Sequence, residues 1–193
     1  MELIFVRHGQ TPGNLKRQYI GCTDQPLAPE GEELARSRQP MMPPIDKLWV
    51  SPMKRCRQTA ALLWPGVEQE AVEDLRECDF GIFECRDYEQ LKHIPSYRAW
   101  IANEPGCGCP GGERRAEFAA RCVRGMDEVL RRSFAAGYER CGVVAHGGTI
   151  MEALSHYMPG NTEIYQWMPK NCGGFRVRAT EKPLAFELLE VLK

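Results

Sequence analysis

The sequence predicts an α/β fold, a three-layer α/β/α sandwich with a mostly parallel central sheet. Short apolar runs typical of buried strands alternate along the chain with longer segments in which apolar residues recur at helical spacing. This alternation is typical of units that place helices on both faces of a parallel sheet. The chain has 193 residues and no internal repeat, so we expect a single domain over residues 1–193.

Five segments are expected to be strands. Residues 3–6 form a continuous apolar run, as a strand buried on both faces requires, and two further short, largely apolar runs follow it along the chain. Two more segments near the C-terminus combine apolar and β-branched residues. In chain order, the expected strands are residues 3–6, 47–50, 142–145, 175–179 and 185–191.

Four helices are expected between these strands. Residues 30–38 follow Pro29, a favourable helix start, and residues 54–63 stop before Pro65. The longest helix is expected over residues 113–134, where apolar residues repeat about every third or fourth position. A fourth apolar face begins at Ile150 and ends before Pro159-Gly160.

Residues 71–112 contain no clear strand pattern and read as an insertion of short helices and loops. Insertions of this kind often shape a pocket. Tyr88, Tyr97 and Trp100 lie in it, and they either stack on a base or ring of a ligand or belong to the core. The one-turn spacing of Tyr97 and Trp100 on a helix face favours the core.

The composition excludes several classes of protein. With 25 Lys+Arg and 26 Asp+Glu, no global basic field points to nucleic acid or an anionic membrane. No apolar run approaches the ~18 residues of a membrane span, and the N-terminus lacks a signal-peptide pattern. Nine scattered cysteines, an odd number, argue for reduced thiols. We therefore expect a cytoplasmic protein without nucleic-acid or membrane partners. The sequence leaves both a monomer and a homodimer open.

Three of the expected strands lead into basic residues. Arg7 and His8 follow the first strand, Arg55 the second and His146 the third. Ligands of open α/β sheets bind beyond the carboxyl ends of the strands, so these side chains converge if the three strands are parallel neighbours. Taken singly, each is more often a surface or turn residue. Together, two guanidinium groups and two imidazoles suit a compact anion, above all phosphate.

These residues, with others along the chain, resemble the histidine phosphatase superfamily, also called phosphoglycerate-mutase-like. The run Arg-His-Gly-Gln-Thr resembles the first histidine motif of the family, and Ala-His-Gly-Gly resembles the second. The resemblance extends over nearly the full length and implies the fold expected above. In chain order, the matching blocks are residues 7–14, 21–31, 51–60, 75–84, 110–113 and 145–148.

Three residues depart from the family pattern. Gln10 stands where an acidic residue is common, Cys85 where glycine is usual, and Arg114 where serine is usual. None of these departures removes a group to which the resemblance gives a catalytic role.

The resemblance implies that His8 attacks phosphorus and forms a phosphohistidine, which water then hydrolyses. Attack requires a neutral imidazole, and neighbouring cations lower the pKa of a histidine. One preorganised donor contributes roughly 3–4 kcal/mol, far less than phosphate-ester hydrolysis needs, so a joint clamp of Arg7, Arg55, His146 and Asn14 is expected. The phosphate-binding residues that the resemblance implies also include two glycines, Gly21 and Gly147.

The oxygen of the leaving group needs a proton. The resemblance selects Glu77 as general acid and then as base for water, whereas the residues alone do not separate it from Asp79. No metal or other cofactor is expected, because arginines do the work that a magnesium ion does elsewhere. The Cys107-Gly108-Cys109 pair lacks the further nearby ligands that a zinc site needs.

A phosphatase is favoured over a mutase. Family mutases carry an Arg-His-Tyr-Gly run after the acidic residue, whereas Cys-Asp-Phe-Gly follows Glu77 here. Residues 75–81 look most like the α-ribazole phosphatase branch of cobalamin synthesis, which makes α-ribazole 5'-phosphate the candidate among small-molecule phosphate monoesters. The alternatives are a phosphoglycerate mutase or broad-specificity sugar phosphatase of the same family and, in another class, a non-catalytic phosphate-binding or scaffold protein.

Overall fold

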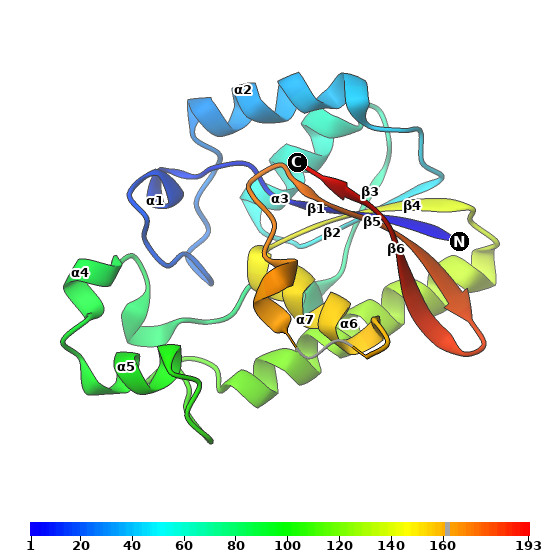
Figure 1. The fold of residues 1–193 in the computed structure, drawn as a ribbon. Coiled ribbons are helices and arrows are strands. Elements are labelled where there is room, and N and C mark those ends of the chain that lie inside the picture. The colour runs from blue at the N-terminus through cyan, green and yellow to red at the C-terminus, as the bar shows by residue number, and fades with distance from the viewer. Residues whose placement is uncertain (161–162) are drawn as a thin grey trace.

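The structure is a computed structural model that describes residues 1–160 and 163–193. Its centre is a six-stranded sheet in the order β3-β2-β4-β1-β5-β6 (Figure 1). The strands β1 to β4 are parallel neighbours, while β5 is antiparallel to β1 and β6 to β5. The strands are β1 (Glu2–Arg7), β2 (Lys47–Val50), β3 (Gln69–Ala71), β4 (Arg140–Ala145), β5 (Gly174–Glu181) and β6 (Leu184–Leu192).

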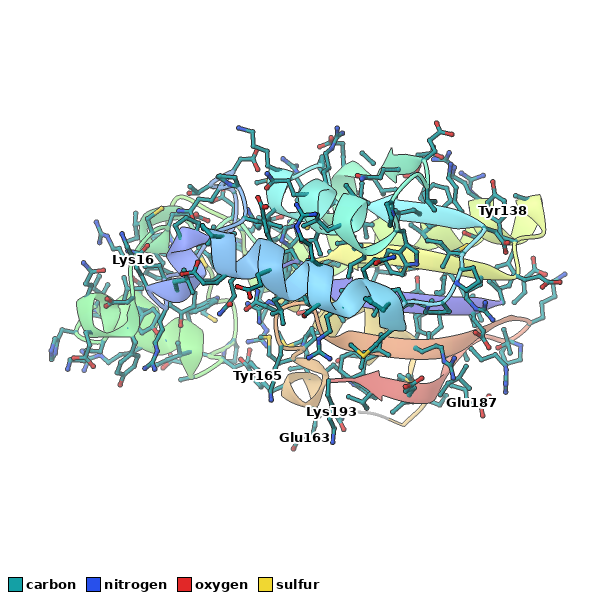
Figure 2. The ribbon with its side chains drawn as sticks, turned by 90° about the horizontal axis from the view of Figure 1, so that it is seen from above. Lys16, Tyr138, Glu163, Tyr165, Glu187 and Lys193 are labelled. Carbon is teal, nitrogen blue, oxygen red and sulfur yellow. The ribbon has the colours of Figure 1, made fainter. Side chains whose placement is uncertain are left out.

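Helices cover both faces of the sheet, which confirms the predicted fold class. On one face α3 packs against the sheet and α2 against α3, and on the other lie α6 and α7 (Figures 1 and 2). The long helix α6 ends at Gly137, whose left-handed φ of 70° closes it. These helices are α2 (Pro29–Arg38), α3 (Lys54–Leu63), α6 (Arg115–Ala136) and α7 (Gly147–Tyr157), each overlapping an expected helix.

Alternation along β1 divides the core in two. Leu3 and Phe5 pack with α6 and α7, while Ile4 and Val6 pack with α3. Successive side chains of a strand point to opposite faces, and β1 has helices on both. A continuous apolar run is therefore what this central position requires.

Residues 71–112 form short elements at one end of the sheet (Figure 1). They include α4 (Tyr88–Leu91), α5 (Pro95–Ile101) and the 3-10 turns Glu73–Leu75 and Gly81–Phe83. Tyr97 is buried in a separate apolar cluster, as its spacing predicts, whereas Tyr88 is 54% exposed. Other short elements are α1 (Pro12–Leu15) and the 3-10 turns Gln39–Met41 and Ile164–Trp167.

The edge strand β3 was not expected from the sequence. Its Gln69-Glu70-Ala71 run has no apolar alternation, and its three residues are half-buried or exposed. Pairing with β2 rather than burial of side chains places it in the sheet. Of the nine cysteines, all are free and six are buried. Within the described residues, no helix combines the length and apolar character needed to cross a membrane.

Removing a core side chain tests the packing around β2. Leu48 is fully buried against α3, whereas Leu188 on the edge strand β6 is 40% exposed. We expect Leu48→Ala to lower the free energy of unfolding by about 2–5 kcal/mol, because it leaves a cavity. The matched change Leu188→Ala should cost less than about 1 kcal/mol. Urea unfolding midpoints measure both, and equal losses would contradict this description of the core.

Candidate active site

A cavity of about 600 Å³ opens at the carboxyl ends of the parallel strands. Its wall includes the end of β1, the loop after β3, and the beginnings of α6 and α7. Because β1 lies beside β4 and β4 beside β2, the three basic strand ends expected from the sequence are brought to one edge. Of the sequence-predicted residues, five line this cavity: Arg7, His8, Asn14, Glu77 and Gly147.

His8 follows β1 and is almost completely buried. Its Nδ1 lies 2.7 Å from the carbonyl oxygen of Gly9, so Nδ1 carries the proton and donates it there. The lone pair of a neutral ring then lies on Nε2. Burial, reinforced by the charges of Arg55 and Arg7, lowers the pKa of His8 well below 6.5. His8 is therefore a neutral imidazole with one free basic nitrogen.

Arg7 offers donors that the fold does not use. One terminal nitrogen, Nη1, donates to the carbonyl of Pro169 at 2.9 Å. The Nε–H is buried and has no partner among the described residues. Gly147, the first residue of α7, lies beside this guanidinium. A buried unpaired donor next to a helix N-terminus favours an anion.

Glu77 reaches the cavity from the loop after the 3-10 turn Glu73–Leu75. Its carboxylate accepts the backbone N–H of Cys78 and that of Gly148, each at 3.0 Å. A Cβ on Gly148 would lie 2.4 Å from the carboxylate, so only glycine permits this approach. Burial raises the pKa of Glu77, against the opposing effect of these N–H groups and of Arg55 and Arg7. Asp79 instead binds the N–H of Gly81 and does not line the cavity.

His146 and Arg55 are fully buried beside His8 and do not line the cavity. The rings of His146 and His8 have centroids 5.1 Å apart. Arg55 Nε donates to His146 Nδ1 at 3.3 Å, which leaves the proton on Nε2, 2.7 Å from the hydroxyl of Ser51. Burial, with the charge of Arg55, lowers the pKa of His146 well below 6.5. His146 is thus neutral, with both nitrogens engaged by the protein.

Arg55 also binds the loop that precedes α2. Its terminal nitrogens donate to the carbonyls of Thr23 at 3.0 Å and Gly21 at 2.7 Å. Gly21 therefore holds Arg55 and does not itself face the cavity. Asn14 does line it, and its side-chain oxygen accepts the N–H of Thr11 at 3.1 Å. Any bond from Asn14 to a ligand would come from its amide NH2 group.

Two residues that hold His8 in place were not identified from the sequence. Asn171 donates to the carbonyl of His8 at 2.9 Å, and Thr59 accepts the N–H of Gly9 at 2.9 Å. Asn171 lies in a loop after the 3-10 turn Ile164–Trp167, far along the chain from β1. Thr59 belongs to the matching block of residues 51–60, but the sequence pattern does not indicate its contact with Gly9.

Part of the cavity wall is aromatic, and Arg17, Arg115 and Glu152 also line it. Tyr19, Phe80 and Trp100 meet edge to face on one side, with centroids 5.4–5.8 Å apart. Tyr165, which Figure 2 labels, and Met168 lie elsewhere on the wall, and Tyr165 is 59% exposed. Trp100 is half-buried and, unlike Tyr97, faces this cavity. The core assignment favoured for both aromatics is therefore incomplete for Trp100.

The departures from the family pattern lie outside the cavity wall. Cys85 has a left-handed φ of 58°, which explains why glycine suits that position. The backbone N–H of Arg114 donates to Glu117 at the start of α6. The backbone oxygen of Gln10 accepts the N–H of Ala28, and nothing in the structure explains its amide side chain.

One group among the described residues has the spacing of metal ligands: Cys22, Asp79 and Glu84. The Glu84 carboxylate accepts the backbone N–H groups of Gly21, Cys22 and Thr23 and the hydroxyl of Thr23. This carboxylate therefore fastens a loop. The Cys107–Cys109 pair does not belong to this group.

Comparison with known proteins identifies a family whose model matches nearly the whole chain and phosphatases of similar sequence. The family model of the histidine phosphatase superfamily (branch 1) matches residues 3–190. A broad-specificity phosphatase of Saccharomyces cerevisiae is 33% identical over 168 residues, which are 80% of this chain and 69% of that protein. The adenosylcobalamin/alpha-ribazole phosphatase of Salmonella typhimurium is 32% identical over 130 residues, or 64% of either chain.

Solved structures agree on the fold. The alpha-ribazole phosphatase of Shigella flexneri superposes with a TM-score of 0.88 at 22% identity, over 100% of this chain and 96% of that one. A phosphoglycerate mutase of Thermus thermophilus superposes with a TM-score of 0.72 at 29% identity, over 100% and 99%. The family model covers the chain almost from end to end and named phosphatases are among its relatives. The chain therefore belongs to branch 1 of the histidine phosphatase superfamily and is a phosphatase enzyme.

Proposed function

We propose that this phosphatase hydrolyses a small-molecule phosphate monoester through a phosphohistidine on His8. The observation that carries the proposal is the contact of His8 Nδ1 with the carbonyl oxygen of Gly9, 2.7 Å away. The Gly9 carbonyl binds Nδ1 and burial lowers the pKa, so Nε2 is an available nucleophile. Arg7 and Glu77 line the same cavity, which supplies a cation for the phosphoryl oxygens and an acid for the leaving group.

In the first step, Nε2 of His8 attacks phosphorus in line while the bond to the ester oxygen breaks. That oxygen takes the proton of Glu77, whose raised pKa favours the protonated acid. In the second step, the Glu77 carboxylate accepts a proton from water as the water oxygen attacks phosphorus. The bond between phosphorus and Nε2 of His8 breaks, inorganic phosphate leaves, and the imidazole and the acid return to their starting states.

Cationic and dipolar groups stabilise the phosphoryl oxygens in this mechanism. Arg7 contributes its unpaired Nε–H, Asn14 its amide, and Gly147 the N-terminus of α7. For Arg55 and His146, direct bonds to phosphate stay a prediction, because both engage protein groups. Gly21 contributes by accepting a bond from Arg55. No metal enters the mechanism, since these groups supply the positive charge.

The cavity supports a substrate larger than phosphate and with an aromatic or apolar part. Its volume of about 600 Å³ exceeds what a phosphate group fills, and its wall includes Tyr19, Phe80, Trp100 and Tyr165. Aromatic rings of this kind pack favourably on a flat ring. Together with the relative named as an alpha-ribazole phosphatase, this wall makes α-ribazole 5'-phosphate our proposed substrate. We also infer a cytoplasmic enzyme from its nine free cysteines.

Loss of the nucleophile gives the first test. We expect His8→Ala to abolish hydrolysis of p-nitrophenyl phosphate, because no other group takes over covalent catalysis. The exposed histidine His93 supplies a control, and His93→Ala should keep wild-type kcat/KM. Wild-type activity should survive EDTA. Turnover by His8→Ala, or a wild type inactive on every monoester of a broad panel, would contradict the proposal.

The pH dependence of kcat/KM gives a second test, in which the shifted pKa values of His8 and Glu77 set the direction of each change. Because the pKa of His8 is lowered, the imidazole stays neutral and reactive below pH 6.5. Because the pKa of Glu77 is raised, kcat/KM should fall as pH rises through a midpoint above the usual 4.5. Glu77→Gln should remove this alkaline fall. The ester also ionises, so both proteins are measured on the same ester and its contribution to the pH profile cancels. A fall that persists in Glu77→Gln would exclude Glu77 as the acid.

A third test addresses the aromatic wall. Tyr165 and Tyr88 are both exposed tyrosines, 59% and 54%, but only Tyr165 lines the cavity. We expect Tyr165→Ala to lower kcat/KM for α-ribazole 5'-phosphate about two- to tenfold relative to glycerol phosphate. Tyr88→Ala should leave this ratio unchanged. If sugar phosphates or 3-phosphoglycerate were preferred over α-ribazole 5'-phosphate by wild type, the proposed substrate would be wrong.

A further inference from the structure

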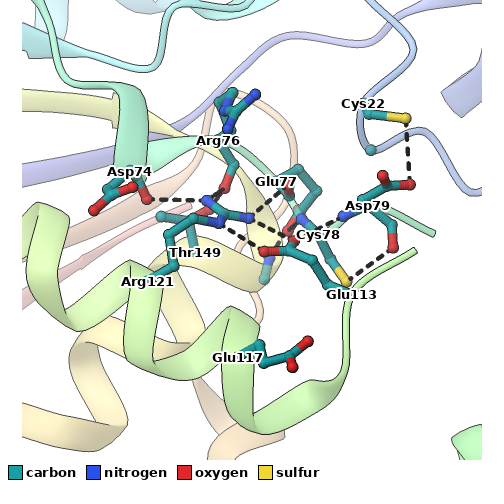
Figure 3. Close-up of polar contacts among 12 residues, drawn as sticks. Cys22, Asp74, Arg76, Glu77, Cys78, Asp79, Glu113, Glu117, Arg121 and Thr149 are labelled. Carbon is teal, nitrogen blue, oxygen red and sulfur yellow. Dashed lines mark hydrogen bonds and ion pairs between the residues drawn. The ribbon is translucent and has the colours of Figure 1, made fainter. Parts of the chain in front are cut away.

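A buried arginine of α6 binds the backbone of the segment that carries Glu77 (Figure 3). Arg121 is only 8% exposed and makes five hydrogen bonds through its guanidinium group. Nη1 donates to the carbonyls of Asp74 at 3.1 Å and Arg76 at 2.9 Å. Nη2 donates to the carbonyl of Glu77 itself at 3.1 Å.

Glu113 orients this arginine. Its carboxylate oxygens accept Arg121 Nε and Nη2, each at 2.7 Å. One of them also accepts the backbone N–H of Asp79 at 2.9 Å. A bidentate ion pair of this kind fixes the orientation of the guanidinium plane and pairs its positive charge. Arg121 is therefore held rigidly between α6 and the loop around Glu77.

Besides Arg121, local backbone bonds hold the segment around Glu77, among them the bond that the Arg76 N–H donates to the Glu73 carbonyl at 3.2 Å. Glu77 itself follows the short 3-10 turn Glu73–Leu75 and lies outside the helices and strands. From α7, the hydroxyl of Thr149 donates to the carbonyl of Arg76 at 3.1 Å. Arg121 and Thr149 thus hold the backbone, while the N–H groups of Cys78 and Gly148 hold the carboxylate.

The sequence of α6 accommodates this contact at a glycine. A Cβ on Gly125, one turn beyond Arg121, would lie 2.9 Å from Asp74 Cβ and 3.0 Å from its carbonyl carbon. Glycine costs helix stability in a helix interior, by roughly 0.5–1 kcal/mol. At this position it lets the segment approach α6 closely enough to reach the guanidinium.

We propose that Arg121, oriented by Glu113, is a positioning residue that sets where the Glu77 carboxyl delivers its proton. This rests on the proposed role of Glu77 as general acid. Arg121 does not line the cavity, so it acts through the Glu77 backbone and not on the substrate. General acid catalysis contributes about 10²–10⁴-fold, and an error of roughly 1 Å in position costs as much as about 10²-fold.

Two esters separate this role from a general structural role. The p-nitrophenolate group leaves without needing a proton, whereas the alkoxide of glycerol phosphate needs one. We would measure kcat/KM, which reports phosphohistidine formation, for Arg121→Lys and Glu113→Gln. Each is expected to lose about 10²-fold on glycerol phosphate but less than about threefold on p-nitrophenyl phosphate. A partly unfolded enzyme loses activity equally on both esters.

Arg124→Ala is the matched control. Arg124 lies about one turn further along α6 and pairs with the Asp74 side chain at 3.2 Å, but its own side chain is 62% exposed. Its ion pair reaches a side chain of the segment and not the carbonyls that Arg121 binds. Arg124→Ala should therefore keep wild-type kcat/KM on both esters, since it leaves the Arg121 contacts in place.

Equal losses on the two esters in Arg121→Lys and Glu113→Gln would overturn the inference. If Arg121→Lys fails to fold, Glu113→Gln decides the question alone, because it keeps the arginine and the shape of its partner.

Glu77→Gln, measured in the same way, keeps the two proposals apart. A selective loss on glycerol phosphate in Glu77→Gln supports its role as the acid. If that loss is absent, the proposed acid is wrong and the inference about Arg121 falls with it. If Glu77→Gln is selective but Arg121→Lys and Glu113→Gln are not, only the positioning role is wrong.

Discussion

The site depends on the parallel pairing of β1 with β4. In this register Arg7 lies opposite Ala145, so the next residues, His8 and His146, leave the sheet side by side with ring centroids 5.1 Å apart. Packed elements bury both rings, and burial is the largest cause that lowers the pKa of each. A neutral nucleophile therefore follows from the topology of the sheet, without a dedicated base to deprotonate it.

The same burial acts on the acid and the nucleophile in useful directions. It lowers the pKa of His8 and raises that of Glu77, because it disfavours the charged form of each group. Both are driven toward the neutral state from which the proposed reaction starts: an unprotonated imidazole and a protonated carboxyl. The backbone N–H groups of Cys78 and Gly148, and then Arg55 and Arg7, oppose this rise in the pKa of Glu77. Environments that push an acid and a base toward complementary states are typical of catalytic pairs.

Much of the fold and part of the site were predictable from the sequence. The apolar run of β1 and the helical spacing in α6 are strong local patterns, because they follow from burial on both faces and on one face. The short edge strand β3 has no such pattern, since pairing with β2 alone places it. The contacts of Asn171 with His8 and of Arg121 with Glu77 join residues distant in the chain, which no local spacing reveals. The family resemblance selected Glu77 over Asp79, a choice that the residues alone did not make, and of the two only Glu77 lines the cavity.

Trapping the phosphorylated enzyme tests the central claim most directly. After a short incubation with substrate and a quench in alkali, which preserves phosphohistidine, peptide mapping and ³¹P NMR identify the residue and the nitrogen that carry phosphate. Because Nδ1 of His8 is bound to the Gly9 carbonyl, we predict phosphate on Nε2 of His8. Phosphate on His146, on Nδ1 of His8 or on any other residue would contradict the proposed mechanism.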